Sequence, residues 1–420
     1  MKYTTLIGHV QSGKTHEEIN FCYRSISENI PVIFITRNII SDQLQLQERI
    51  LLYKEKLNVQ LLRNISIDDG VSFLNSVGIL ILLCNSNQLN KAQCVLNKYN
   101  GIYNVCIDEV DFSLKTSDNS SKTDQILNTI KHGSNRVLGA TATPFAIFST
   151  DSALTKCRYI KPGKTYRGIN SLQVKFVPPN VQSDTEIYTS LLTKERAVLL
   201  HTVSKKKSDH TTLLNNISSE WNTFTVLTYN GDGIQMICKN RPLIPFTKAR
   251  SSNQYGQVIL KYFYLNGVHH FHNWSISNVL QLLVDDPHHN HTHISIISGH
   301  LASRGISFVS SDFTLHLTDQ YFHPGKKTHG ENFIQSLRIL GCYKDTTQLS
   351  LWCTEHTWKC ILQHHKIIND VVHGIDNSTE WITKIQEINL EKPDTPLCRP
   401  QFTRKNVFTK INAYYNFKLK

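Results

Sequence analysis

The chain has little of what membrane proteins, disulfide scaffolds and zinc ribbons are built from. Its longest apolar run is Val77–Cys84, whereas a membrane-spanning helix needs about 20 apolar residues. No secretory signal precedes the apolar segment Tyr3–Ile7. The ten cysteines include no C-x-x-C pair, and most stand among apolar residues, where cysteine behaves as a small hydrophobe in a reducing compartment. We therefore expect a soluble, intracellular protein of the cytoplasm or nucleus that binds no membrane.

Acidic residues are also scarce. There are 33 Asp and Glu against 45 Lys and Arg, which gives a net charge of +12. Such a balance favours a polyanionic partner, and nucleic acid comes before an anionic membrane surface. The 420 residues, 40% of them hydrophobic, suffice for two or three domains, and the chain contains no solenoid repeat and no long low-complexity tract.

Short apolar runs alternate with helical patterns in two series, which predicts an α/β fold of two lobes with parallel sheets. The expected strands of the first series are Thr4–Ile7, Val32–Thr36, Gly78–Leu83, Tyr103–Ile107 and Arg136–Gly139. Those of the second are Arg196–Thr202, Phe224–Gly233, His293–Gly299, Phe313–Asp319 and Leu349–Thr354, with a helix over Asn332–Leu340. In such sheets ligands bind beyond the carboxyl ends of the strands.

The two series define the expected domains. We place a nucleotide-binding lobe at residues 1–148 and a linker at 149–194. The second lobe follows at 195–358, and a short helical and basic C-terminal extension occupies 359–420.

The stretch IGHVQSGKTHEEI contains G-x-x-x-x-G-K-T, the spacing of a phosphate-binding loop, after a strand and at the start of a helix. Backbone N–H groups and the helix N-terminus would hold the β- and γ-phosphates of ATP. Lys14 would pair with phosphate oxygens and the Thr15 hydroxyl would ligate Mg²⁺. Taken alone, the motif also fits a glycine-rich turn that caps a helix. The expected ATP-binding residues of the loop are Gly8, Gln11, Ser12, Gly13, Lys14 and Thr15.

Two carboxylates, Asp108 and Glu109, directly follow an apolar strand in YNVCIDEVDF. Asp108 is positioned to hold Mg²⁺, and Glu109 to orient and deprotonate an attacking water. Paired acids in this place also suit a helix N-terminus, where they complement the dipole. Their position several strands after the phosphate loop favours the catalytic interpretation.

The segment GATATPFA follows the next strand and supplies two hydroxyls, Thr141 and Thr143. Short hydroxyl side chains at this edge can link the catalytic residues to the partner lobe, and the alternative is an ordinary exit from strand to turn. Loop, acidic pair and T-A-T-P in this order predict a lobe that binds and splits a nucleoside triphosphate.

These motifs resemble those of superfamily-two helicases, with G-K-T, then D-E-x-D, then T-A-T-P, and the resemblance implies two RecA-like lobes. The segment FITRNIISDQ resembles the T-R-x-x-x-x-Q segment of that group, although Gln43 lies one residue later than usual. The resemblance implies that Thr36 and Arg37 contact the phosphates of a bound strand.

The second lobe carries S-R-G in SGHLASRGISF, similar to the A-R-G segment of helicases. This similarity implies that Arg304 and Gly305 couple the nucleic-acid path to the nucleotide. In NFIQSLRILGCYKD we expect Gln335 and Arg338 one helical turn apart on one face. Gln335 would contact ATP. Arg338 is the candidate arginine finger, a contribution to rate on the order of 10³–10⁵.

The common helicase pattern Q-x-x-G-R-x-x-R is not kept, because Ile339 and Cys342 occupy its arginine positions. A closer likeness is to helicase-like proteins with the Z-one domain, a putative endonuclease, which show V-Q-S-G-K-T, T-A-T-P-F-A, S-R-G and Q-M-G-R-W-F-G-Y-R. This likeness covers roughly residues 4 to 355 and keeps Gln335, Arg338 and Gly341 in their relative places. The closing arginine is replaced by Tyr343 or Lys344, and a lysine supplies charge without a bidentate fork.

The run SKKKSDH places Lys205 and Lys206 after the first strand of the second lobe. They would line a phosphate track or form a solvated face. No nuclease signature stands out in the sequence.

Together these features predict an ATP- and Mg²⁺-dependent, helicase-like motor that translocates on or remodels nucleic acid, with DNA favoured over RNA. Two alternatives stay open, a nucleic-acid-binding ATP switch without unwinding activity and a helicase-linked nuclease. So compact a helicase suits a large DNA virus or a bacterial defence locus.

Overall fold

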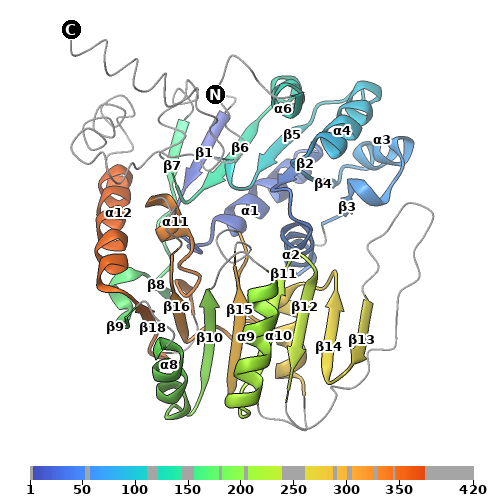
Figure 1. The fold of residues 1–420 in the computed structure, drawn as a ribbon. Helices are drawn as coiled ribbons and strands as arrows, with labels where there is room; N and C mark the ends of the chain where they lie inside the picture. The colour runs from blue at the N-terminus through green and yellow to red at the C-terminus, as the bar shows by residue number, and fades with distance from the viewer. Residues whose placement is uncertain are drawn as a thin grey trace.

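Two β-sheets form the framework of the molecule, one in each lobe (Figure 1). Their geometry comes from a computed structural model. None of the helices within the described residues is long and apolar enough to span a membrane. The structure describes residues 3–52, 57–110, 122–143, 156–178, 182–202, 207–238, 261–286, 291–299, 305–324, 330–343 and 346–373.

The first lobe is a seven-stranded sheet with the order β3-β4-β2-β5-β6-β1-β7, and every neighbouring pair is parallel. The strands are β1 (Tyr3–Ile7), β2 (Val32–Thr36), β3 (Val59–Leu61), β4 (Ile79–Leu83), β5 (Asn104–Ile107), β6 (Val137–Thr141) and β7 (Lys156–Tyr159). The helices are α1 (Lys14–Ser27), α2 (Ile40–Leu51), α3 (Ile67–Asn75), α4 (Ser86–Lys98) and α6 (Lys122–Gly133).

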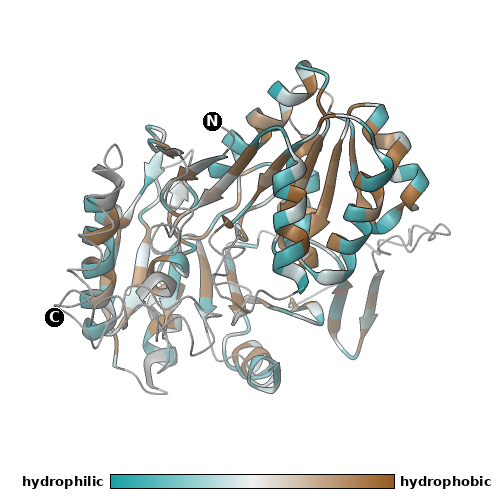
Figure 2. Cartoon of the chain, turned by 90° about the horizontal axis from the view of Figure 1, so that it is seen from above, coloured by the Kyte–Doolittle hydropathy of each residue, from teal (hydrophilic) through white to brown (hydrophobic). Residues whose placement is uncertain are grey.

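Helices cover both faces of this sheet, so its inner strands β2 and β4 are almost wholly apolar rather than alternating. Successive residues of β2 point to opposite faces. Val32 and Phe34 pack with α1 and α2, whereas Ile33 and Ile35 pack with α3, α4 and α6. In Figure 2 the strands of this lobe are mainly brown, and the helices around them mix brown with teal.

The second lobe is a nine-stranded sheet with the order β13-β14-β12-β11-β15-β10-β16-β18-β9. It is parallel from β11 to β9 and extended by the antiparallel strands β12, β14 and β13. The strands are β9 (Gln173–Phe176), β10 (Ala197–Thr202), β11 (Thr225–Asn230), β12 (Gly233–Ile237), β13 (Lys261–Leu265), β14 (Val268–His272), β15 (His293–Ser298), β16 (Asp319–Phe322) and β18 (Ser350–Cys353). The helices are α8 (Gln182–Leu192), α9 (Lys207–Glu220), α10 (Ile276–Val284), α11 (Gly330–Gln335) and α12 (Glu355–His373).

The predicted α/β fold with two RecA-like lobes is therefore confirmed. The segment predicted as a linker supplies a strand to each sheet, because β7 pairs with β1 and β9 pairs with β18. It also supplies β8 (Tyr166–Arg167), which pairs with β17 (Gly341–Cys342) as a separate two-stranded ribbon. Of the predicted C-terminal extension, only the part up to His373, within α12, lies among the described residues.

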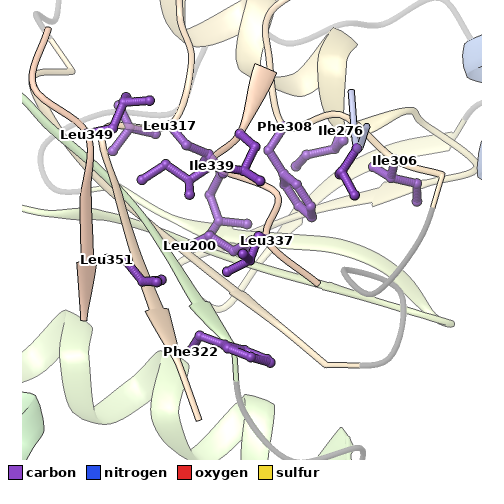
Figure 3. Packing of buried hydrophobic residues seen from close by; sticks show 14 of the residues in the cluster. Leu200, Ile276, Ile306, Phe308, Leu317, Phe322, Leu337, Ile339, Leu349 and Leu351 are labelled. Atoms are coloured by element: carbon purple, nitrogen blue, oxygen red, sulfur yellow. The ribbon is translucent and has the colours of Figure 1, made fainter. Parts of the chain in front are cut away.

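Two predicted elements of the second lobe were wrong. The expected strand Phe313–Asp319 is irregular, and β16 begins where it was predicted to end. The expected helix Asn332–Leu340 stops at Gln335, so Gln335 and Arg338 do not share a helical face. Leu337 and Ile339, two residues apart, both insert into the hydrophobic core (Figure 3). This alternation cannot be satisfied by a helix, and tertiary packing overrides the helical pattern.

The lobes pack directly against each other through α2, which lies between the two sheets (Figure 1). Gln45 of α2 donates to the Ser277 hydroxyl over 2.9 Å and to the Ser307 carbonyl over 3.2 Å. Glu48 accepts from Asn278 over 2.6 Å and from Ser275, the N-cap residue of α10, over 3.0 Å. A carboxylate at a helix N-terminus is favourable because it meets the positive end of the helix dipole.

We expect Phe34→Ala to destabilise the first lobe by about 3–5 kcal/mol, because the change leaves a cavity beneath α1 and α2. Phe34 is fully buried. Urea unfolding followed by far-UV circular dichroism measures the loss. Phe176→Ala, at an exposed edge position, is the matched control and should change stability by less than about 0.5 kcal/mol. Equal losses for the two variants would contradict the packing described here.

Candidate active site

The phosphate-loop sequence folds into a tight turn between β1 and α1. Gly8 donates its backbone N–H to the Thr141 carbonyl over 3.1 Å, which ties the loop to the end of β6. A Cβ atom at Gly8 would lie 2.8 Å from the Ser12 hydroxyl. Gly13 precedes the helix with φ of 99°, a left-handed conformation that glycine adopts without strain. Gly13 is thus favoured by its backbone conformation, and Gly8 by the close approach of the Ser12 side chain.

Lys14 is the first residue of α1, and its side chain is 8% exposed. Its ammonium donates to the His9 carbonyl over 2.9 Å and to the Gly8 carbonyl over 3.4 Å. Burial lowers the pKa of Lys14, while the carboxylates of Glu109 and Asp108 act to raise it. The ammonium is therefore held over its own loop, facing the acidic pair.

Asp108 and Glu109 follow β5, as the sequence predicted. Glu109 has φ of 52°, an unusual backbone conformation for a residue with a side chain. Burial, with the nearby carboxylates of Glu109 and Asp42, raises the pKa of Asp108 to about 7, although Arg37 and Lys14 act to lower it. A cation bound beside Asp108 would favour its ionised form.

Several polar atoms around the loop lack hydrogen-bond partners within the described part of the chain. The Gln11 side-chain nitrogen, the Ser12 hydroxyl and the Gln335 side-chain oxygen are buried and unpaired. Unpaired buried polar atoms are rare and costly, and the two donors lie in the loop that the motif assigns to phosphate. The unpaired donors fit the phosphates of a nucleotide, and Thr15 and Asp108 carry oxygen atoms of the kind that Mg²⁺ prefers as ligands.

Gln335 connects the second lobe to the catalytic edge of the first. Its side-chain nitrogen donates to the Thr143 hydroxyl over 2.8 Å and to Glu109 over 3.4 Å. The Thr141 hydroxyl in turn accepts from the Thr143 backbone N–H over 3.0 Å. The T-A-T segment and Glu109 thus contact the same side chain of the partner lobe.

Arg338 follows α11 in a turn rather than within a helix. The neighbouring Leu337 and Ile339 are fully buried in the second-lobe core (Figure 3), which directs the guanidinium to the other side. It donates to the Ile306 carbonyl over 3.3 Å and to the Gln335 carbonyl. Backbone carbonyls of the second lobe therefore orient Arg338 toward the first.

The site residues surround one cavity of about 370 Å³ between the lobes. Ligand pockets are usually of about 300–1,000 Å³. Cys342 and Tyr343 also reach the cavity wall, whereas Lys344 lies outside the described residues. The predicted site residues that line the cavity are Gln11, Gly13, Lys14, Thr15, Asp108, Glu109, Gly305 and Arg338.

The predicted nucleic-acid contacts lie inside the protein in this arrangement of the lobes. Arg37 forms a buried ion pair with Asp42 over 2.6 Å, and Thr36 is 1% exposed. A Cβ atom at Gly305 would lie 2.5 Å from the Arg37 guanidinium, so the second lobe covers this pair. Arg304, Lys205 and Lys206 lie outside the described residues.

The ribbon of β8 and β17 was missed by the sequence analysis. Tyr166 in β8 donates its hydroxyl to the Val10 carbonyl of the phosphate loop over 2.9 Å. In β17, a Cβ atom at Gly341 would lie 2.9 Å from the side-chain oxygen of Gln11. The ribbon therefore joins the turn after Arg338 to the phosphate loop. The sequence gives no local signal for this pairing, because the two strands lie far apart in the chain.

No protein family and no curated protein matches the sequence. Among solved structures, the fold is similar to S. cerevisiae Dbp5 bound to RNA and ADP BeF3, with a TM-score of 0.50, 12% identity, and coverage of 90% of this chain and 88% of that chain. A singly substituted Dbp5 in the same complex gives the same values. RecG bound to a three-way DNA junction has a TM-score of 0.49 and 11% identity, covering 98% of this chain and 47% of that chain. The likeness to Dbp5 supports the two-lobed fold.

We expect Asp108→Asn to stabilise the nucleotide- and Mg²⁺-free protein increasingly as pH rises from about 4 to about 7. The folded-state pKa of Asp108 is raised from 3.8 to about 7, so ionisation opposes folding above the unfolded pKa. Melting temperatures of variant and wild type at pH 5, 6, 7 and 8 measure the difference. Asp68→Asn, on the exposed side of α3, is the control and should show no such trend. A stabilisation of Asp108→Asn that shrinks with rising pH would contradict the environment described.

Proposed function

We propose that the protein is an ATP-dependent, helicase-like motor that hydrolyses ATP to translocate on or remodel nucleic acid, DNA in preference to RNA. The observation that carries the proposal is that residues of both lobes line one cavity. The first lobe lines it with Lys14, Asp108 and Glu109, and the second lobe lines it with Arg338. A phosphate loop, an acidic pair and an arginine from the opposite lobe are the parts that phosphoryl transfer to water requires.

The first lobe would bind the nucleotide and activate water. Lys14 would leave the carbonyls of Gly8 and His9 to pair with phosphate oxygens. Thr15 and Asp108 would hold Mg²⁺, which supplies positive charge at the phosphates. Glu109 would orient the attacking water and accept its proton. A bound cation beside Asp108 would also relieve the crowding of carboxylates that raises its pKa.

The second lobe would complete the site. The Arg338 guanidinium would meet the negative charge that develops on the transferred phosphoryl group. Gln335 contacts Thr143 and Glu109, so a change at the γ-phosphate would reach the second lobe through this link. The motor would use it to move the lobes relative to each other during hydrolysis.

Nucleic acid would bind across both lobes. The net charge of +12 supports a polyanionic partner. Gly305 covers the Arg37–Asp42 pair, so opening of the lobes would uncover Arg37, and closure would hide it again. We propose that Thr36, Arg37, Arg304, Lys205 and Lys206 form the contacts to the strand.

A nucleotide-gated binder without motor activity is the second candidate. Cys342 reaches the cavity wall at a position where the helicase pattern has arginine. A site with fewer arginines from the second lobe would hydrolyse ATP slowly and hold its closed state longer. The two candidates differ in turnover rather than in what they bind.

Steady-state ATP hydrolysis, with and without single-stranded DNA or RNA, tests the proposal. We expect wild-type turnover to rise with nucleic acid, and more with DNA. Glu109→Gln should lower turnover by about 10²–10⁴-fold and Arg338→Ala by about 10³-fold or more, while ATP still binds. Lys14→Ala should lose both binding and turnover. Arg24→Ala, at the exposed end of α1, is the control and should behave as wild type.

If ATP turnover rises with neither DNA nor RNA and is unchanged in Arg338→Ala, the nucleotide-gated binder without motor activity would be favoured. Metal-dependent cleavage of nucleic acid that persists in Lys14→Ala would favour a nuclease instead. A larger response to RNA than to DNA would overturn the preference for DNA and leave the motor intact.

A further inference from the structure

A second arginine, Arg49, reaches the nucleotide cavity, although no sequence motif includes it. It stands in the last turn of α2, is half-buried, and lines the same cavity as Lys14, Asp108 and Arg338. Within the part of the chain that the structure describes, its guanidinium has no hydrogen-bond acceptor. An arginine without an acceptor keeps its planar fork of donors for a ligand.

Arg49 lines the same cavity as the acidic pair Asp108 and Glu109. Burial lowers the pKa of Arg49, and the carboxylates of Asp108, Glu48 and Glu18 act to raise it. Glu18 is itself fully buried, with both oxygens unpaired among the described residues. Arg49 thus faces carboxylates without being locked to any of them, next to the aspartate proposed to hold Mg²⁺.

The contact between the lobes sets the position of Arg49. The preceding residue, Glu48, accepts from Ser275 and Asn278 at the start of α10, and Gln45 one turn earlier is bonded to Ser277 and Ser307. The end of α2 is therefore anchored on the second lobe. Leu46 and Ile50 of the same helix pack in the core of the first lobe, so Arg49 is held where the two lobes meet.

We infer that Arg49 is a second phosphate-binding arginine of the nucleotide site. It comes from α2 and takes the role of the arginine that the helicase pattern has at the position of Cys342. The inference rests on the proposed ATP site, because it takes a nucleoside triphosphate as the ligand. Next to Asp108, the guanidinium would contact the terminal phosphate, which ATP carries and ADP lacks. Arginine binds phosphate through paired, charge-assisted hydrogen bonds.

Calorimetric titration with ADP and with the non-hydrolysable analogue AMP-PNP, both with Mg²⁺, tests the inference without turnover. We expect Arg49→Ala to weaken AMP-PNP binding by about 10–100-fold, the loss of a charge-assisted hydrogen bond, and ADP binding by much less. Arg49→Lys should fall between, because lysine keeps the charge without the fork. Arg24→Ala serves again as the control.

A purely structural role would give another result. If Arg49 only neutralises Asp108 and Glu18, Arg49→Ala would lower the melting temperature of the nucleotide-free protein and leave the ratio of AMP-PNP to ADP affinity unchanged, which would overturn the inference. Should Arg49→Ala not fold, an unchanged ratio in Arg49→Lys has the same meaning. If the wild-type protein binds neither nucleotide, the proposed ATP site is wrong as well. If both Arg49 variants keep the wild-type preference for AMP-PNP over ADP, only the role of Arg49 is wrong.

Discussion

One hydrophobic cluster joins the core of the second lobe to the phosphate loop and the T-A-T segment of the first. It contains Leu337 and Ile339, which flank Arg338, together with Val10 of the phosphate loop and Ala142 of the T-A-T segment. Burial of these side chains is non-directional, but interiors pack at crystal-like density and leave few alternative arrangements. The cluster therefore sets how far the arginine of one lobe stands from the lysine of the other.

Next to this hydrophobic cluster, charged side chains of both lobes gather around one cavity. Lys14, Asp108 and Glu109 come from the first lobe and Arg338 from the second, and all are buried or line one cavity. Desolvation disfavours the charged forms of Asp108 and Lys14, and so raises the pKa of Asp108 and lowers that of Lys14. Such a site is costly without its ligand, and a nucleotide with Mg²⁺ would supply the missing partners. Lobe contact and ligand binding are expected to be coupled for this reason.

Local patterns in the sequence were reliable where strand and turn chemistry act over a few residues. The phosphate loop, the acid pair after β5 and the hydroxyls after β6 lie where they were predicted, because each directly follows a buried parallel strand. The apolar pattern of Asn332–Leu340 predicted a helix, but the helix ends at Gln335. Leu337 and Ile339, two residues apart, then both enter the core. Local patterns also missed β7, β9 and the β8–β17 ribbon, whose partners lie far away in the chain.

The sequence by itself determined the two-lobed α/β class and the residues that meet at the carboxyl edge of the first sheet, because these depend on short-range periodicity and motif spacing. Only the tertiary structure decided that Arg37 is buried under Gly305, that Gln335 bonds to Thr143, and that Arg49 enters the cavity. Each of these depends on how two separately patterned lobes pack, and that packing follows from side chains more than a hundred residues apart rather than from any local stretch.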